Sequence, residues 1–239
     1  MTELLFQKKP YAREVDAHVT GQTPEGAILV DASVFYPAGG GQPGDSGRVT
    51  WDGGSVGIAT AVKAEGGRVA LVPTEPVALP KPGVVIHQTI DWERRHAHMR
   101  VHTGLHLLSV VIPLGVTGGS ISEARGRLDF DMPDAPEDKP GLEAALNDLV
   151  ARDLPVTEDW ITEAELDANP GLVKTMSVQP PRGAGRIRLI RIGEGTAQVD
   201  LQPCGGTHVA RTSEIGTVRL GKIEKKGRRN RRVYLHLSA

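Results

Sequence analysis

The chain has 239 residues, a formal net charge of −1, 39% hydrophobic residues and one cysteine. This length can bury a sizeable core and can form one large domain or two small ones. No apolar run approaches the ~18 residues that span a bilayer, and the N-terminus lacks the basic-then-apolar order of a secretion signal. A lone cysteine excludes an internal disulfide, so we expect a protein of the reducing cytoplasm without a membrane partner.

Residues 1–88 consist of short apolar or alternating segments separated by turns that contain glycine and proline. Segments typical of β-strands cover residues 27–32, 57–64, 68–73 and 84–90. This pattern predicts a small antiparallel β-barrel or sandwich.

A glycine-rich segment, FYPAGGGQPGD, lies within this region at residues 35–45. Gly39, Gly40 and Gly41 would let the backbone approach another backbone or a ligand closely, with the amide of Gln42 beside it. The segment lacks the helix-opening lysine of a phosphate-binding P-loop, which argues against nucleoside triphosphate binding. A hairpin loop between two barrel strands is the alternative.

The rest of the chain mixes helix and strand patterns. The clearest helix covers residues 93–111, with Val101, Leu105 and Leu108 on an apolar face. One long strand-like segment follows at 118–131. An acidic region then predicts a helix over 141–152 and a capping box at 162–165. Further strands are predicted over 186–192, 197–201, 217–222 and 232–237.

Two pairs of possible metal ligands have the same spacing. His102 and His106 are four residues apart in the predicted helix, so both imidazoles share one face. Cys204 and His208 are also four apart, and the two glycines between them would allow a tight bend that turns both side chains inward. Three imidazoles and one thiolate suit Zn²⁺, which takes nitrogen and sulfur in a tetrahedral shell. An ordinary helix histidine pair and a buried thiol remain the alternative.

Neighbouring residues restrict this interpretation. His98 lies four residues before His102, which leaves a second possible pair within the helix. No glutamate follows His102, which argues against a HExxH metalloprotease because that enzyme needs the carboxylate as its general base.

The charge is unevenly distributed along the chain. Residues 181–239 hold thirteen of the 28 basic side chains and four of the 29 acidic ones. A solvated basic loop is one interpretation, and a phosphate-binding edge is the other. Aromatic residues are scarce, so base stacking is not the obvious mode. Seven basic side chains are concentrated in one segment: Lys222, Lys225, Lys226, Arg228, Arg229, Arg231 and Arg232.

The order of these motifs resembles that in the free-standing alanyl-tRNA editing proteins of the AlaX type, in their medium form. The shared motifs are FYPAGGGQPGD, HTGLH at 102–106, LDF at 128–130, CGGTH at 204–208 and the closing EIG at 214–216 with its basic segment. The resemblance covers nearly the whole chain and extends to the editing domain of alanyl-tRNA synthetase.

The resemblance implies an α+β fold in two parts. A small N-terminal antiparallel β-barrel would span 1–88, and a zinc-binding editing domain like the second additional domain of threonyl- and alanyl-tRNA synthetases would span 89–239. In this second part the histidine helix would pack on an antiparallel sheet. The resemblance also implies that the Gly39–Gln42 loop reaches the substrate pocket.

The implied activity is hydrolysis of the aminoacyl ester at the 3′ end of mischarged tRNA(Ala). Seryl-tRNA(Ala) would be the chief substrate, and glycyl-tRNA(Ala) another possible one. One Zn²⁺ would be held by His102, His106, Cys204 and His208, with the basic segment contacting tRNA. His98 has no place in this pattern and is expected on the helix surface or behind the ligands.

The group that senses the serine hydroxyl is open. By position the candidates are Thr103, Gln42 and Glu123, and Asp129 is either a polar anchor in the pocket or a strand-end cap. Leu105 is apolar where the synthetase form can carry threonine, which leaves the identity of this group in doubt.

The role of the metal is also open. With four protein ligands the shell is full, and the ion would position the substrate; with one ligand displaced it could polarise the ester or a water. Two other functions compete with the editing enzyme. One is a zinc-stabilised tRNA-binding module without catalysis, and the other is a metallohydrolase of small molecules.

Overall fold

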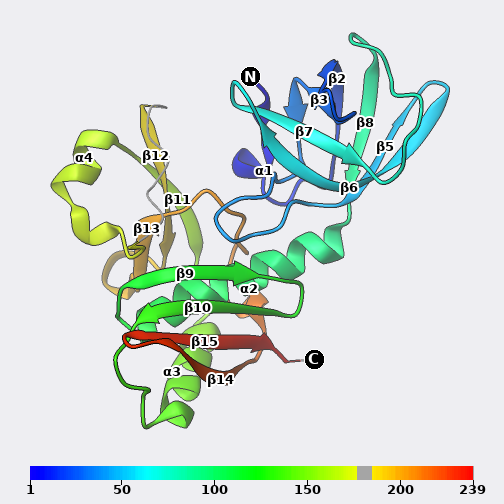
Figure 1. The fold of residues 1–239 in the computed structure, drawn as a ribbon. Coiled ribbons are helices and arrows are strands. Elements are labelled where there is room, and N and C mark those ends of the chain that lie inside the picture. The colour runs from blue at the N-terminus through cyan, green and yellow to red at the C-terminus, as the bar shows by residue number, and fades with distance from the viewer. Residues whose placement is uncertain (177–184, 239) are drawn as a thin grey trace. The chain divides into compact units, whose positions relative to one another are not determined.

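The computed structural model describes residues 1–176 and 185–238. Two compact units divide the chain, Met1–His96 and Ala97–Ala239. The division falls within helix α2 (Trp92–Val111), whose first turn belongs to the N-terminal unit (Figure 1). None of the helices in the described part of the chain combines the length and apolar composition needed to cross a membrane.

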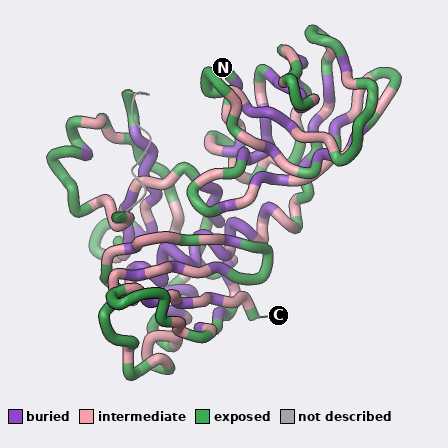
Figure 2. Tube along the Cα trace, viewed as in Figure 1, coloured by how far each residue is buried: buried purple, intermediate pink, exposed green. Residues whose placement is uncertain are grey.

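The N-terminal unit is a closed antiparallel barrel with the strand order β2-β3-β7-β6-β5-β8. Buried and exposed residues alternate along its strands (Figure 2), because successive side chains point to opposite faces. This confirms the barrel that the sequence predicts. The strands are β2 (Glu14–Gln22), β3 (Ile28–Val30), β5 (Gly47–Trp51), β6 (Gly54–Ala64), β7 (Arg68–Pro73) and β8 (Val85–Ile90).

Two short strands and a short helix of this unit lie outside the six barrel strands. Strand β1 (Glu3–Leu4) pairs in parallel with β4 (Ala32–Ser33). Helix α1 (Leu5–Lys8) follows β1 and contributes Phe6 to the barrel core. The ring of Phe6 meets that of Tyr36 edge-on, with the centroids 5.3 Å apart.

A buried ion pair joins the glycine-rich segment to the first turn of α2. The carboxylate of Asp45 accepts from Nε of Arg95 at 2.8 and 3.0 Å, and neither side chain is more than 1% exposed. The same guanidinium donates to the carbonyl of Val34 at 2.6 Å, and the amide of Tyr36 donates to Asp45 at 2.6 Å. All these residues belong to the N-terminal unit.

The run Gly39–Gln42 forms a two-residue hairpin turn. The backbones of Gly39 and Gln42 exchange hydrogen bonds of 3.0 and 3.1 Å. Gly40 and Gly41 between them have φ of 57° and 82°, so both positions favour glycine. The two turn residues are exposed, whereas Gln42 is 2% exposed. The local geometry of Gly39–Gln42 is therefore that of a hairpin loop, which was the alternative interpretation of this segment.

The C-terminal unit contains a four-stranded sheet in the order β14-β15-β10-β9. In Figure 1, α2 passes behind β9 and β10. The side chains that face the helix are buried, and they include Leu128, Phe130, Val233 and Leu235. The strands are β9 (Val116–Ile121), β10 (Arg125–Asp131), β14 (Val218–Gly227) and β15 (Asn230–Leu237).

The sequence prediction of one strand over 118–131 is wrong, because the segment forms the hairpin of β9 and β10. Residues 122–124 turn the chain, and Ser122 closes the turn through its hydroxyl, which donates to the carbonyl of Arg125 at 3.0 Å. The segment has strand propensity on both sides of a turn that contains neither glycine nor proline, so the turn left no clear signal.

A second sheet has the order β11-β12-β13. Thr162 caps the short helix that follows β11 and forms the predicted capping box with Glu165. The elements are β11 (Val156–Thr162), α4 (Glu163–Ala168), the 3-10 turns η1 (Pro170–Leu172), η2 (Gly195–Ala197) and η3 (Thr212–Ile215), β12 (Arg186–Ile192) and β13 (Asp200–Pro203).

Helix α3 (Lys139–Ala151) covers the outer backbone edge of β14. The side chain of Asn147 donates to the carbonyl of Val218 at 2.8 Å and accepts from its amide at 2.9 Å. Glu143 accepts from the amide of Leu220 at 2.7 Å. Two side chains of the acidic region therefore take the place of a fifth strand.

Removal of the buried carboxylate tests the ion pair. Asp45→Ala leaves the Arg95 guanidinium buried and without its charged partner, so the free energy of unfolding in urea should fall by about 3–5 kcal/mol. Asp52→Ala, in an exposed turn of the same unit, is the control and should change it by less than about 0.5 kcal/mol. Equal losses in the two variants would contradict a stabilising role for the pair.

Candidate metal centre

Helix α2 places two imidazoles on one face. The rings of His102 and His106 have centroids 5.3 Å apart, and the residues are 8% and 7% exposed. On another face, a Cβ built on Gly126 of β10 would lie 2.6 Å from Val101 and 2.9 Å from Leu105. Close contact with the sheet on that face therefore leaves the histidine face for the ligand group.

The cysteine follows strand β13, and a buried arginine fixes its loop. Nη1 of Arg188 donates to the carbonyls of Cys204 at 3.1 Å and Gly206 at 2.9 Å, and Nε donates to Glu158 at 2.7 Å. The amide of Cys204 donates back to the carbonyl of Arg188 at 3.1 Å. Arg188 thus ties the loop to strand β12.

The two glycines after Cys204 do not act through left-handed backbone. Neither Gly205 nor Gly206 is among the glycines with positive φ, and a Cβ on Gly205 would meet open space. The amide of Gly206 donates instead to Sγ of Cys204 at 3.4 Å. Hydrogen bonds, rather than glycine conformation, account for the bend.

The two predicted pairs meet in one cluster. One ligand atom from each of His102, His106, Cys204 and His208 lies within 4.8 Å of the others. Sγ of Cys204 is 3.5 Å from Nε2 of His102 and 3.3 Å from Nε2 of His208. Such a group could hold a metal ion, and its three nitrogens and one sulfur match a four-coordinate site.

Thr103 orients His208. Its hydroxyl donates to the carbonyl of Met99 at 2.9 Å, so it acts as the acceptor for Nδ1 of His208 at 3.1 Å and for the amide of Val209 at 3.3 Å. A proton on Nδ1 leaves Nε2 of His208 with a lone pair directed at the cluster.

Asp200 orients His106 in the same way. Its Oδ2 is 2.9 Å from Nδ1 of His106, and its carboxylate is fully buried. Oδ1 accepts from Nζ of Lys174 at 2.6 Å, and Oδ2 accepts from Nε2 of Gln202 at 2.8 Å. Ser109 completes the network by donating to the carbonyl of His106 at 2.7 Å.

Sequence reasoning missed this network. Lys174 lies far from the ligands in the chain and carries no motif. Asp200 and Gln202 did leave a signal, because alternating residues of a strand face one side and both precede Cys204. Arg188 gave none, since nothing in the sequence places it beside the cysteine loop.

Electrostatics favour the metal-binding forms of Cys204 and His208, whereas His106 would have to lose a proton to bind a cation. Burial opposes charge on His106 and Asp200, but their hydrogen bond outweighs it, raising the pKa of His106 to about 9 and lowering that of Asp200 to about 2. Burial raises the pKa of Cys204, yet the nearby His102 and His208 hold it well below its usual value. Burial and His102 lower the pKa of His208 to about 3. A thiolate and a neutral imidazole are the forms that bind a cation.

The other predicted pocket residues do not join the cluster. Asp129 lies on β10 and accepts from Arg232 at 2.7 and 2.9 Å and from Arg127 at 2.8 Å. Burial raises its pKa, but these two arginines hold it below the ordinary value. Glu123 lies exposed in the turn between β9 and β10. Gly39–Gln42 belongs to the other unit.

His98 is only 1% exposed, which contradicts the first of its two expected positions, the helix surface, and leaves the position behind the ligands as the prediction. It lies one turn before His102 on α2 but is not a member of the four-residue group.

The basic segment forms the hairpin of β14 and β15, and its side chains differ in their surroundings. Arg231 is 9% exposed and donates to backbone carbonyls, including that of Gly227 at 3.2 Å. Arg229 pairs with Asp131 at 3.1 Å. The exposed residues of the segment are Lys222, Lys225, Lys226, Arg228 and Arg229.

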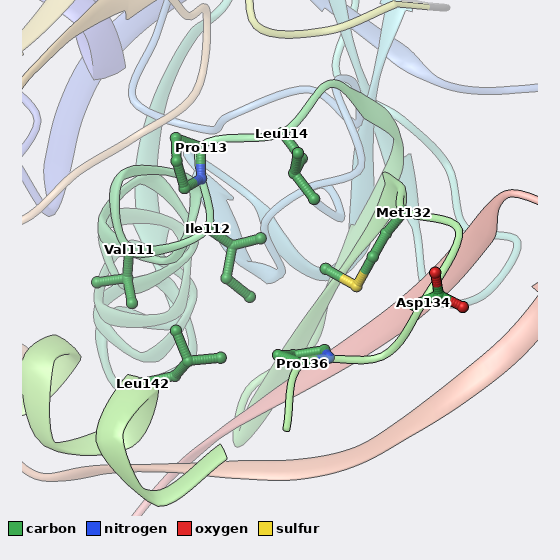
Figure 3. Close-up of a pocket in the computed structure, with 8 residues that line it drawn as sticks. All are labelled: Val111, Ile112, Pro113, Leu114, Met132, Asp134, Pro136 and Leu142. Atoms are coloured by element: carbon green, nitrogen blue, oxygen red, sulfur yellow. The ribbon is translucent and has the colours of Figure 1, made fainter. Parts of the chain in front are cut away.

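Two cavities lie at the C-terminal end of α2. The smaller, of about 240 Å³, is largely apolar, and no predicted site residue lines it (Figure 3). The larger, of about 460 Å³, is lined partly by Ser109 and Lys174, which belong to the Asp200 network. Neither cavity is lined by the four ligands.

The carboxylate behind His106 offers a test of this geometry. Asp200→Asn removes the charge that fixes the His106 ring, so affinity for Zn²⁺ or Co²⁺, measured by competition with a chromogenic chelator, should fall about 10–100-fold. The exposed Asp134→Asn carries the same change and should leave affinity unaltered. Equal affinities in both variants would show that Asp200 does not support a metal ligand.

Comparisons with known proteins identify the family of this chain. A family model described as the threonyl and alanyl tRNA synthetase second additional domain matches residues 187–234. The chain is 33% identical over 245 residues to the alanyl-tRNA editing protein AlaX-M of Methanosarcina barkeri, covering 99% of both chains. It is 30% identical over 247 residues to AlaX-M of Methanosarcina acetivorans, again covering 99% of both. Against the alanine–tRNA ligase of Pyrobaculum arsenaticum it is 34% identical over 233 residues, which are 94% of this chain and 25% of the ligase. The chain therefore belongs to the family of alanyl-tRNA editing proteins.

Proposed function

We propose that this protein hydrolyses the aminoacyl ester of mischarged tRNA(Ala) in trans, chiefly seryl-tRNA(Ala) and also glycyl-tRNA(Ala). The observation that carries the proposal is the convergence of His102, His106, Cys204 and His208 in a chain that matches an AlaX-M protein from end to end. We further propose a cytoplasmic location, which a single cysteine acting as a thiolate ligand supports because thiols stay reduced there.

The need for a second hydrolytic site follows from the chemistry of the amino acids. A pocket shaped for alanine cannot strongly exclude glycine, which is smaller, or serine, which adds one hydroxyl. An editing site can accept serine and spare alanine if one of its polar groups loses a partner when the hydroxyl is missing.

The proposed cofactor is one Zn²⁺ held by the four ligands. Three imidazoles and a thiolate match the donors that this ion prefers, and Thr103 and Asp200 fix two of the rings with Nε2 toward the cluster. When bound, the ion would supply positive charge that positions the substrate, because four protein ligands fill a tetrahedral shell.

The candidate residues for binding the serine hydroxyl differ in the hydrogen bonds that they already make. The hydroxyl of Thr103 already donates to Met99 and accepts twice, so its contacts support a role in orienting His208 rather than in reading serine. Asp129 is occupied by two arginines. Gln42, beside its glycine turn, and Glu123 remain the proposed sensing groups, with Gly39, Gly40 and Gly41 giving the backbone room to approach the ester.

We also propose that the tip of the β14–β15 hairpin contacts the tRNA backbone. Lys225 and Arg228 are exposed there, and Lys222 and Lys226 share a single carboxylate, Glu224. Arg231 and Arg232 contribute mainly by holding the hairpin in place, since their guanidinium groups bind Pro133 and Asp129.

The proposal is tested by deacylation of seryl-, glycyl- and alanyl-tRNA(Ala) with metal content measured on the same samples. The wild-type protein should release serine and spare alanine. His102→Ala and Cys204→Ala should each reduce kcat/KM by more than about 100-fold, because a direct ligand matters more than the groups behind it. His18→Ala, on an exposed barrel histidine, is the control and should act like wild type.

The competing functions give different outcomes. Binding of tRNA without release of serine above the buffer rate would indicate an RNA-binding module. Hydrolysis of small esters, unaffected by loss of the hairpin charges, would indicate a small-molecule hydrolase. Unchanged turnover in both ligand variants would refute the assigned centre.

A further inference from the structure

The four-stranded sheet of the C-terminal unit has two unlike faces. One face is buried against α2, as the contact between Gly104 of the helix and Leu235 of β15 shows. The side chains of the opposite face are half-buried or exposed and mostly cationic. We call this second surface the open sheet face. Its basic and aromatic residues are Arg125, Arg127, Arg219, Lys222, Arg232, Tyr234 and His236, and its carboxylates are Asp129, Asp131 and Glu224.

Three basic residues form one row across this face. His236 of β15 is paired with Arg125 of β10 on one side and with Arg219 of β14 on the other. Residues directly opposite in antiparallel strands have neighbouring side chains, and like charges in such positions destabilise a sheet. Burial, and then Arg219 and Arg125, lower the pKa of His236. The neutral form of His236 is therefore favoured between two arginines that remain charged.

The next row adds an aromatic ring among further cations. Tyr234 is paired with Arg127 of β10, and Nζ of Lys222 lies 5.7 Å from the centre of the tyrosine ring. The phenolic hydroxyl donates to Glu224 at 3.2 Å, which fixes the ring on the sheet. Ser120 of β9 is paired with Arg127, and its small side chain leaves space above this part of the face.

Carboxylates on the face are outnumbered. Asp129 is shared by Arg127 and Arg232, and Glu224 is shared by Lys222 and Lys226. Each of these two anions thus faces two cations, and a third carboxylate on the face, Asp131, pairs with Arg229. The Arg–His–Arg row adds two more arginines. A surplus of this kind attracts a polyanion and makes its binding sensitive to salt.

From this charge and geometry we propose that the open sheet face is a docking surface for the phosphodiester backbone of the tRNA substrate. Arginine forks match phosphate oxygens in pairs, and a fixed tyrosine ring can contact a ribose or base. Tyr234 is the one large apolar ring of the face, so the chemistry suits RNA better than an apolar protein surface. This inference rests on the proposed editing function and adds a contact surface distinct from the ligand cluster.

The test compares two double variants that each lose two positive charges. Arg125→Gln with Arg219→Gln changes the open sheet face, and Arg48→Gln with Arg152→Gln changes two exposed arginines elsewhere. Binding of uncharged tRNA(Ala) is measured by fluorescence anisotropy over a series of KCl concentrations. The first variant should bind about tenfold more weakly, and the slope of log K against log salt should fall by roughly 1–2. The control should keep the slope of wild type.

A fold measurement and an activity measurement complete the design. The Tm of Arg125→Gln with Arg219→Gln should equal that of wild type, because both side chains are exposed. With seryl-tRNA(Ala), its KM should rise while kcat stays unchanged. A salt slope equal to that of the control would overturn the docking surface. Failure of the wild type to release serine, with the salt difference intact, would instead refute the editing function alone.

Discussion

The hydrogen bond between Asp200 and His106 joins residues that are 94 positions apart, and the centre depends on it. It connects helix α2 to strand β13, from which the cysteine loop starts. A helix can place two histidines on one face by its period alone, but it cannot decide which ring nitrogen points inward. The hydrogen bond to Asp200 fixes the orientation of the His106 ring, and the hydrogen bond to Thr103 fixes that of the His208 ring. The same two contacts hold the ligand-bearing segments at a fixed separation.

Local patterns were sufficient to predict the barrel, helix α2, strand β12 and the capping box of α4, because each depends on residues close in sequence. Strand β11 escaped prediction because most of its side chains are polar and exposed, which blurs a period of two. Strand β2 also escaped prediction, although its buried and exposed side chains alternate. The hairpin of β9 and β10 was predicted as one strand-like segment for a related reason, since its turn contains neither glycine nor proline. Failures of this kind arise where tertiary pairing, rather than propensity, decides the structure.

The same division holds for the centre. The spacing of four residues pointed to all four ligands, because helix period and a short loop both act locally. Lys174 and Arg188 could not be found in this way, since each acts across the chain on another element. Different residues of the glycine-rich segment have different roles. Asp45 and Gly44 serve the barrel, as a Cβ on Gly44 would lie 2.2 Å from the carbonyl of Ala61, whereas the turn at Gly40 and Gly41 is exposed.

The way helix α3 closes the edge of β14 has a consequence for self-association. Exposed strand edges recruit strands from other molecules, and cationic hairpins concentrated along an RNA would bring such edges together. Here Asn147 and Glu143 occupy the amides and carbonyl that an incoming chain would need. The part of the β14 edge at Val218 and Leu220 is thereby closed to a strand from another copy of the protein.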